Sequence, residues 1–151
     1  MQLKAKDYIL VGFQIILCVV YIYDFKLINL KMLPFIKLVG IILTVSGIII
    51  LLLGMLQLNK NLSPFPTPKA NSEFVKTGLY KFVRHPIYTG ILLNFLGYGI
   101  YSGSVFRILI TLVLYILFIM KARYEEKLLM KRYNNYASYR EKTGRFFPKI
   151  F

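Results

Sequence analysis

The sequence predicts an all-α integral membrane protein, with about four transmembrane helices that form two hairpins and a cytoplasmic helical extension at the C-terminal end. Of its 151 residues, 57% are hydrophobic and only 17% are charged. A soluble domain typically contains about 45–50% apolar residues, so this composition favours a chain that spans a bilayer. Several uncharged apolar runs also approach the roughly 20 residues that a helix needs to cross the hydrocarbon core. The length predicts a single domain, residues 1–151.

The first predicted span covers residues 8–23, an uncharged run near the start of the chain. The second, 36–58, is the most apolar and contains Gly40, Gly47 and Gly54. Because these glycines recur every seven residues, they lie near one helix face and can let a neighbouring helix approach closely. The other interpretation is that glycine is simply common in membrane helices.

The third span is predicted over residues 87–101 and the fourth over 105–120, with a short Ser-Gly-Ser turn between them. We therefore expect these two spans to form an antiparallel hairpin. A cytoplasmic linker, 59–86, precedes them, and a cytoplasmic tail, 121–151, follows them. No helix breaker precedes Gly144, so we expect the fourth helix to continue into the tail.

Basic residues predict the orientation in the membrane. The chain has 20 Lys and Arg against 6 Asp and Glu, a net charge of +14. Most of these cations lie before the first span, in the linker or in the tail. Because cytoplasmic loops are enriched in Lys and Arg, we expect both termini, the linker and the tail on the cytoplasmic side. Attraction to anionic lipids of the bilayer then explains the charge without a nucleic-acid partner.

The counts of cysteine and histidine exclude several kinds of site. A single cysteine, Cys18, excludes an intramolecular disulfide and a cysteine-based zinc site, and we interpret it as a packing residue. A single histidine, His85, excludes a multi-histidine metal site. We therefore expect no bound metal. The long apolar runs also exclude intrinsic disorder.

The first segment suited to chemistry lies beside the start of the third span and contains Tyr80, Arg84, His85 and Tyr88. Pro86 suits the first turn of a helix, where its missing N–H costs nothing. His85 is then expected at or near the N-cap. The free N–H groups and the positive end of the helix dipole at that point favour an anion such as a carboxylate.

The second segment follows the fourth span and contains Arg123, Glu125 and Glu126. The two glutamates are among only six acidic residues, and they lie where the inner-leaflet potential disfavours an anion. A helical stripe of tyrosines follows, formed by Tyr133, Tyr136 and Tyr139. Each feature has a simpler interpretation by itself. The arginines can be anchors for lipid headgroups, the glutamates can belong to a solvated face, and the tyrosines can be packing residues at the membrane interface. Because both segments adjoin one hairpin on one side of the membrane, their combination predicts a binding site.

These residues resemble the isoprenylcysteine carboxyl methyltransferase family, which shares a superfamily with the phospholipid N-methyltransferases. The resemblance rests on Arg-His-Pro-x-Tyr-x-Gly at 84–90, the Glu-Glu pair roughly 35 residues later, and Arg-Phe-Phe-Pro at 145–148. It covers about the C-terminal half of the chain, and the N-terminal half matches only as generic membrane helix. It implies an integral-membrane methyltransferase that binds S-adenosylmethionine without a Rossmann domain.

The resemblance also implies a site between the last two spans and the tail. The expected cofactor-binding residues are Tyr80, His85, Tyr88, Gly90, Gly97, Gly99, Glu125 and Glu126. The expected catalytic residues are Arg84, Arg123 and His85, and the expected acceptor-binding residues are Arg84, Arg123, Tyr136 and Tyr139. A planar guanidinium suits a carboxylate acceptor. An amine acceptor must lose a proton, for which a histidine is a suitable base near neutral pH.

The sequence therefore predicts an S-adenosylmethionine-dependent methyltransferase that acts on a carboxylate of a hydrophobic acceptor reached from the bilayer. The alternative within the same chemistry is N-methylation of a lipid amine. Two alternatives belong to other classes: an NADPH-dependent membrane sterol or enone reductase, which has a related C-terminal helical region, and a non-catalytic membrane protein. The small size resembles that of a prokaryotic member, so we expect the protein in the inner membrane.

Overall fold

The computed structural model describes residues 2–25 and 28–149, so residues 150–151 of the predicted tail lie outside the described residues. The described residues form helices and no extended strand. The α-helices are α1 (Ala5–Tyr23), α2 (Pro34–Leu58), α3 (Pro86–Ser102), α4 (Val105–Arg132) and α5 (Tyr136–Lys142), and the short 3₁₀ helices are η1 (Asn59–Asn61) and η2 (Gly78–Lys81). The predicted all-α membrane fold class is confirmed.

Three helices of the described residues are long and apolar enough to cross a membrane, namely α1, α2 and α4. The fourth long helix, α3, has 17 residues, which is the lower end of the usual range of about 17–25 for a spanning helix. It begins with Pro86 at its first turn and His85 as the N-cap residue, as the sequence predicts. It ends at Ser102 and is followed by Gly103, whose φ of 67° suits the turn into α4.

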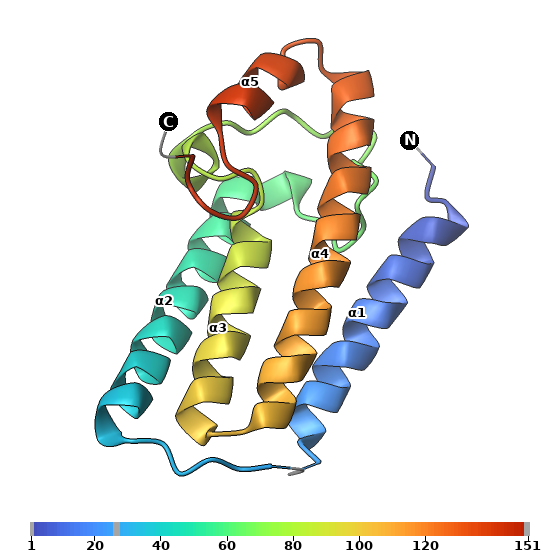
Figure 1. The fold of residues 1–151 in the computed structure, drawn as a ribbon. Helices are drawn as coiled ribbons and strands as arrows, with labels where there is room; N and C mark the ends of the chain where they lie inside the picture. The colour runs from blue at the N-terminus through green and yellow to red at the C-terminus, as the bar shows by residue number, and fades with distance from the viewer. Residues whose placement is uncertain (1, 26–27, 150–151) are drawn as a thin grey trace.

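The helices pack in the order α2, α3, α4, α1 (Figure 1). The predicted α3–α4 hairpin is present, but α1 packs against α4 rather than against α2. The reason is the connection from α1 to α2, which runs across the α3–α4 turn. There, the Leu30 N–H donates to the Gly103 carbonyl over 2.8 Å and the Val105 N–H donates to the Ile28 carbonyl over 3.2 Å.

The apolar core lies between α1 and α4, beside the site described below. Its buried members are Leu10, Leu17, Leu114, Leu117, Phe118, Ala122 and Phe146. Phe146 comes from the tail, so the core fixes the tail as well as the two helices.

Glycines bring the backbones of α2 and α3 into direct contact. A Cβ added at Gly40 would lie 2.7 Å from the Tyr101 amide nitrogen, and one at Gly90 would lie 2.6 Å from that of Leu51. Real Cβ atoms do not approach other atoms so closely. The close-packing interpretation of the glycine repeat is therefore confirmed, and α2 and α3 form a rigid pair that sets the position of His85.

Helix α4 continues past its apolar part, as the sequence predicts, but it ends at Arg132 and does not reach Gly144. Asn134 and Asn135 form a turn between α4 and α5, in agreement with the preference of asparagine for turns. The expectation of one continuous helix was wrong at this point. As a result, Tyr133 and Tyr136 lie on opposite sides of a turn and do not form a single helical stripe.

The tail folds back onto the segment that precedes α3. The Arg84 N–H donates to the Gly144 carbonyl over 2.9 Å, and the His85 N–H donates to the Arg145 carbonyl over 3.1 Å. In return, the Gly144 N–H donates to the Phe82 carbonyl over 3.2 Å. These backbone hydrogen bonds bring together the polar segments that the sequence analysis singled out.

We predict that Gly40→Ala destabilises the protein by about 1–3 kcal/mol, because the added methyl group forces α2 away from α3. Thermal unfolding of the purified protein in detergent measures this effect. Gly12→Ala in α1 is the matched control, since nothing lies within 4 Å of a Cβ at that position and alanine favours a helix. Equal melting temperatures for Gly40→Ala and wild type would contradict the packing argument.

Candidate functional site

The carboxylate of Glu126 is the centre of the polar cluster. It projects from α4 and is only 2% exposed. Its Oε1 accepts hydrogen bonds from Arg84 Nε over 3.0 Å and Arg145 Nε over 3.1 Å, while Oε2 accepts one from Arg145 Nη2 over 3.0 Å. His85 Nε2 lies 3.2 Å from Oε1, and Arg140 Nε lies 3.8 Å from Oε2. One buried anion therefore joins α4, the start of α3 and the tail.

The guanidinium of Arg84 is committed to this cluster. Its Nη1 donates to the Arg140 carbonyl over 2.9 Å and also to the Thr143 carbonyl. The side chain is 8% exposed. The hydrogen bond to Glu126 raises the pKa of the Arg145 guanidinium, which stays charged. Both arginines thus hold the tail in place, through Nε and Nη1 of Arg84 and through Nε and Nη2 of Arg145.

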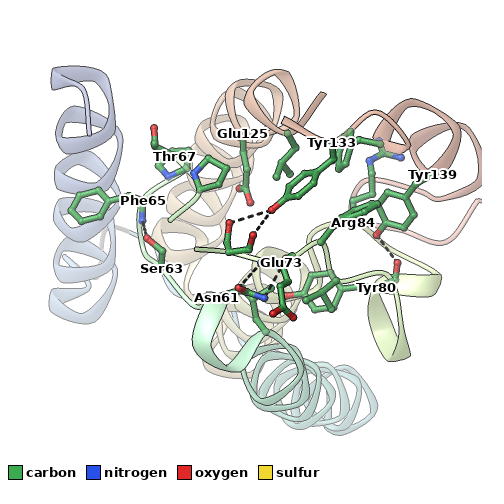
Figure 2. A pocket seen from close by; sticks show the side chains of 18 residues that line it. Asn61, Ser63, Phe65, Thr67, Glu73, Tyr80, Arg84, Glu125, Tyr133 and Tyr139 are labelled. Atoms are coloured by element: carbon green, nitrogen blue, oxygen red, sulfur yellow. Dashed lines mark hydrogen bonds between the residues drawn. The ribbon is translucent and has the colours of Figure 1, made fainter. Parts of the chain in front are cut away.

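The neighbouring glutamate, Glu125, has a different environment. Its Oε2 accepts a hydrogen bond from the Tyr88 hydroxyl over 3.0 Å and lies 3.7 Å from His85 Nδ1. Its Oε1 takes part in no hydrogen bond among the residues that the structure describes. The side chain is 27% exposed, and Figure 2 shows it pointing into a cavity. Glu125 therefore offers a free acceptor oxygen at a partly enclosed position.

Aromatic rings stack beneath this acceptor. The His85 and Tyr88 rings are nearly parallel, at 2°, with centroids 5.2 Å apart. Tyr88 stacks on Phe118 of α4 at 4.6 Å. The stack fixes the Tyr88 hydroxyl beside Glu125 and the imidazole between the two glutamates.

Glu125 lines a cavity of about 90 Å³ (Figure 2). It is enclosed by the linker after α2, by η2, by the end of α4 and by α5. Its polar and aromatic lining residues include Asn61, Ser63, Phe65, Thr67, Glu73, Phe74, Tyr80, Arg84, Glu125, Tyr133, Tyr136 and Tyr139. The linker therefore contributes both polar and aromatic side chains to the cavity, and the tail contributes mainly tyrosines.

Phe74 of the linker packs among three tyrosine rings. Its centroid lies 5.3 Å from that of Tyr133, 5.5 Å from that of Tyr136 and 5.0 Å from that of Tyr139. Burial raises the pKa of Tyr139 to about 12 and that of Tyr136 further still, so both hydroxyls stay protonated. The Tyr139 hydroxyl donates to the Tyr80 carbonyl over 2.5 Å. This aromatic wall connects the linker to the tail.

A second cavity, of about 320 Å³, adjoins the first and extends between the helices. Tyr80, Arg84 and Glu125 line both cavities. The second cavity is mainly apolar along α2, α3 and the start of the linker, through Leu51, Met55, Leu58, Ile87, Ile91 and Leu62. It also contains a buried cation, Lys121, whose Nζ donates to Gln14 Oε1 over 2.5 Å. Glu125 therefore stands where a polar chamber meets an apolar one.

The structure brings together eight of the residues that the sequence analysis selected: Tyr80, Arg84, His85, Tyr88, Glu125, Glu126, Tyr136 and Tyr139. Arg123 does not join them. It lies two positions from Glu125, which is about 200° around a helix, and it lines a separate groove with Lys4 and Lys6. The structure therefore does not place Arg123 at the site where the sequence analysis expected it.

The three glycines expected at the cofactor are packing residues in this structure. A Cβ at Gly90 would meet Leu51, and one at Gly97 would meet the Thr44 amide nitrogen of α2 at 2.5 Å. A Cβ at Gly99 would face Ile108 of α4 at 3.3 Å. Gly97 is also about 14 Å from Tyr88 along the helix, at 1.5 Å per residue.

Sequence reasoning missed several residues of the site. Lys121 is the first charged residue after the fourth apolar run, and only that position could have indicated that it belongs to the site. Arg145 begins the Arg-Phe-Phe-Pro motif, but its ion pair with Glu126 depends on the fold of the tail. Phe74 had no signal at all. Among the described residues, no group of three or more His, Cys, Asp or Glu side chains could hold a metal ion.

Comparison with known proteins adds to this geometry. Residues 35–136 match the model of a family described as phospholipid methyltransferase. The cobalt-zinc-cadmium resistance protein CzcN of Cupriavidus metallidurans is 31% identical over 86 residues, which cover 54% of this chain and 38% of that protein. The nickel-cobalt-cadmium resistance protein NccN of Alcaligenes xylosoxydans xylosoxydans is 26% identical over 83 residues, 54% of this chain and 39% of that protein. The chain thus spans about two fifths of the length of these curated relatives.

A solved structure extends the likeness to the whole fold. The eukaryotic intramembrane Ras methyltransferase, an isoprenylcysteine carboxyl methyltransferase, superposes with a TM-score of 0.70 at 20% sequence identity. The match covers 99% of this chain and 55% of that chain. This chain therefore has the fold of an intramembrane methyltransferase.

We predict that Glu126→Gln strongly destabilises the protein, by about 3–5 kcal/mol, because it leaves buried cations without their anion. The midpoint of thermal unfolding in detergent measures this. Glu73→Gln is the control, since Glu73 pairs with Lys60 at the surface, where both side chains are more than 60% exposed, and exposed pairs contribute about 0–1 kcal/mol. Similar small shifts for both variants would contradict a structural role of Glu126.

Proposed function

Because the chain belongs to the phospholipid methyltransferase family, we propose that it transfers a methyl group from S-adenosylmethionine to a hydrophobic acceptor that reaches the site from the bilayer. The observation that carries this proposal is the position of Glu125. Its free oxygen lies at the junction of a polar, aromatic chamber and an apolar chamber between the helices. A methyl donor and an apolar acceptor can meet at such a junction.

The residues around Glu125 fit the proposed cofactor. Its carboxylate oxygen without a partner suits the ammonium group or the ribose diol, and Tyr80 and Tyr133 offer rings for adenine or for the sulfonium through cation–π attraction. The polar chamber of about 90 Å³ is smaller than the roughly 300–1,000 Å³ of typical ligand sites. We therefore expect the cofactor to extend into the adjoining chamber of about 320 Å³. Bound S-adenosylmethionine supplies an already activated methyl group.

In this proposal the two glutamates have different roles. Glu125 contacts the cofactor, whereas Glu126 is a positioning residue that acts through Arg84 and Arg145. His85 and Tyr88 orient Glu125 through the contacts at 3.7 and 3.0 Å. Arg84 is likewise a positioning residue, because its Nε binds Glu126 and its Nη1 binds two tail carbonyls.

The acceptor is a hydrophobic molecule with a carboxylate, and Lys121 supplies the positive charge that orients it. Lys121 lies in the apolar chamber, 1% exposed. A carboxylate attacks an activated methyl group without a general base, so the protein mainly orients the reactants and excludes water. The apolar residues of α2 and α3 then hold the hydrocarbon part of the acceptor.

N-methylation of a lipid amine is the second candidate, because the matching family model is that of the phospholipid methyltransferases. An amine must lose its proton before it attacks. His85 lies between the two glutamates and lines the apolar chamber, so it is the base that we assign to this reaction.

We also propose that the site faces the cytoplasm. The N-terminal lysines, the linker and the basic tail all lie at the same end of the helices as Glu125 (Figure 1). Cytoplasmic segments of inner-membrane proteins carry most of the Lys and Arg residues.

We predict that Glu125→Gln lowers the affinity for S-adenosylmethionine about 10–100-fold, since a hydrogen bond to a charged group contributes about 1.5–3 kcal/mol. Calorimetric titration of the detergent-purified protein measures it. Glu141→Gln, at an exposed position of α5, is the matched control. Unchanged affinity in Glu125→Gln would remove Glu125 from the site. Binding of NADPH instead would support a reductase, and no binding by the folded protein would support a non-catalytic role.

We predict that the transferred methyl group is released by mild base, as a methyl ester is and an N-methyl group is not. Radiolabelled S-adenosylmethionine is incubated with the protein and either a prenylated cysteine or vesicles of phosphatidylethanolamine. Lys121→Met is expected to lower labelling of the prenylated cysteine at least tenfold at saturating S-adenosylmethionine. Base-stable label on the phosphatidylethanolamine would establish the amine alternative.

A further inference from the structure

A second cluster of cations lies on the side of α4 that faces away from Glu125. It forms a groove of about 510 Å³ between the start of α1 and the cytoplasmic part of α4. The groove is lined by Lys4, Lys6, Met120, Arg123, Tyr124, Lys127, Leu128 and Lys131. Arg123, Lys127 and Lys131 are four residues apart, so they follow one another along one face of α4.

These cations have no acidic partner in the part of the chain that the structure describes. No Asp or Glu lines the groove, and none of its lysines or its arginine takes part in an ion pair there. The acid nearest along α1, Asp7, is buried and accepts hydrogen bonds from the Lys4 and Thr67 backbone N–H groups and from the Thr67 hydroxyl. Like charges at successive helix turns repel one another, so the groove favours an anion.

Tyr124 provides an independent indication of a ligand. Its hydroxyl is the one buried side-chain polar atom without a hydrogen-bond partner within the described residues. Lys6 Nζ lies 4.6 Å from the centre of its ring. Buried polar groups normally have a partner, and a hydroxyl can donate to an anionic oxygen. The groove therefore carries several cations, and one of its lining residues has a buried hydroxyl without a hydrogen-bond partner in the described residues.

The position of the groove identifies the anion as a lipid. Met120 lines it at the end of the apolar run of α4. Exposed apolar side chains continue from it along both helices at spacings of three and four residues: Ile9, Phe13 and Ile16 on α1, and Val113 and Ile116 on α4. A headgroup in the groove would thus have its acyl chains beside an apolar surface, whereas a soluble anion would gain nothing from that surface.

We propose that this groove binds the phosphate headgroup of an anionic phospholipid. Basic pockets at the cytoplasmic ends of membrane helices suit such headgroups. The binding site is separate from Glu125 and does not depend on the proposed methyl transfer. It ties the N-terminal end of α1 to α4 through the ligand. Lys4 and Lys6 lie at the start of α1, and Arg123, Lys127 and Lys131 lie on α4.

The test measures binding of the detergent-purified protein to phosphatidylcholine vesicles with and without phosphatidylglycerol, together with the thermal stability of the protein with each lipid. We expect phosphatidylglycerol to bind and to raise the melting temperature, and phosphatidylcholine to do neither. Inorganic phosphate at equal concentration is expected to compete poorly. Equal effects of the two lipids would overturn the proposal, and full competition by phosphate would show a site for a soluble anion instead.

Two variants locate the site. The triple substitution Arg123→Gln, Lys127→Gln and Lys131→Gln is expected to weaken phosphatidylglycerol binding at least tenfold. Its matched control removes three exposed cations elsewhere: Lys76→Gln, Lys81→Gln and Lys142→Gln. Tyr124→Phe is expected to weaken binding about threefold without loss of stability in detergent alone, since the hydroxyl has no protein partner in the described residues. Equal loss in the triple variant and its control would show diffuse surface attraction and would overturn the site.

Discussion

The buried carboxylate of Glu126 holds together three parts of the chain that are far apart in the sequence. An anion that is 2% exposed needs close compensation, and here Arg84, Arg145 and His85 supply it within 3.2 Å. Because Arg84 precedes α3 and Arg145 lies in the tail, satisfying this one charge also closes the tail over the site. The aromatic wall and both chambers depend on that closure.

Two adjacent glutamates therefore have different consequences for the protein. Successive residues of a helix differ by about 100° in direction, so Glu126 faces the arginines while Glu125 faces the chambers. The same geometry explains the other face of α4, where Arg123 and Tyr124 line the cationic groove. One helix thus contributes to the fold of the tail, to the proposed methyl-transfer site and to the proposed lipid site.

The glycines of α2 and α3 act on the site from a distance. Backbone contact at Gly40 and Gly90 holds the two helices as a unit, and the first turn of α3 carries His85 and Tyr88. Any separation of these helices would shift Tyr88, which hydrogen-bonds Glu125 over 3.0 Å. Close packing of α2 against α3 thus maintains the hydrogen bond between Tyr88 and Glu125.

Local sequence information was sufficient for the helices and for most members of the site. Apolar runs of about 20 residues leave few alternatives to membrane helices, and Pro86 marks the start of α3. The clustering of Tyr80, His85, Tyr88, Glu125 and Glu126 could also be predicted, because their segments adjoin one hairpin.

Only the tertiary structure decided which helices are neighbours and what each polar side chain contacts. The position of α1 beside α4 results from the path of a connection across the α3–α4 turn, which hydropathy cannot reveal. Side-chain directions and the fold of the tail decide three further features. They pair Arg84 with Glu126, bury Lys121 and keep Arg123 away from the site. The sequence by itself determined the membrane helices and the chemical types present, because those depend on neighbouring residues. Contacts between residues that are distant in the sequence decided which polar groups remain free to bind a ligand.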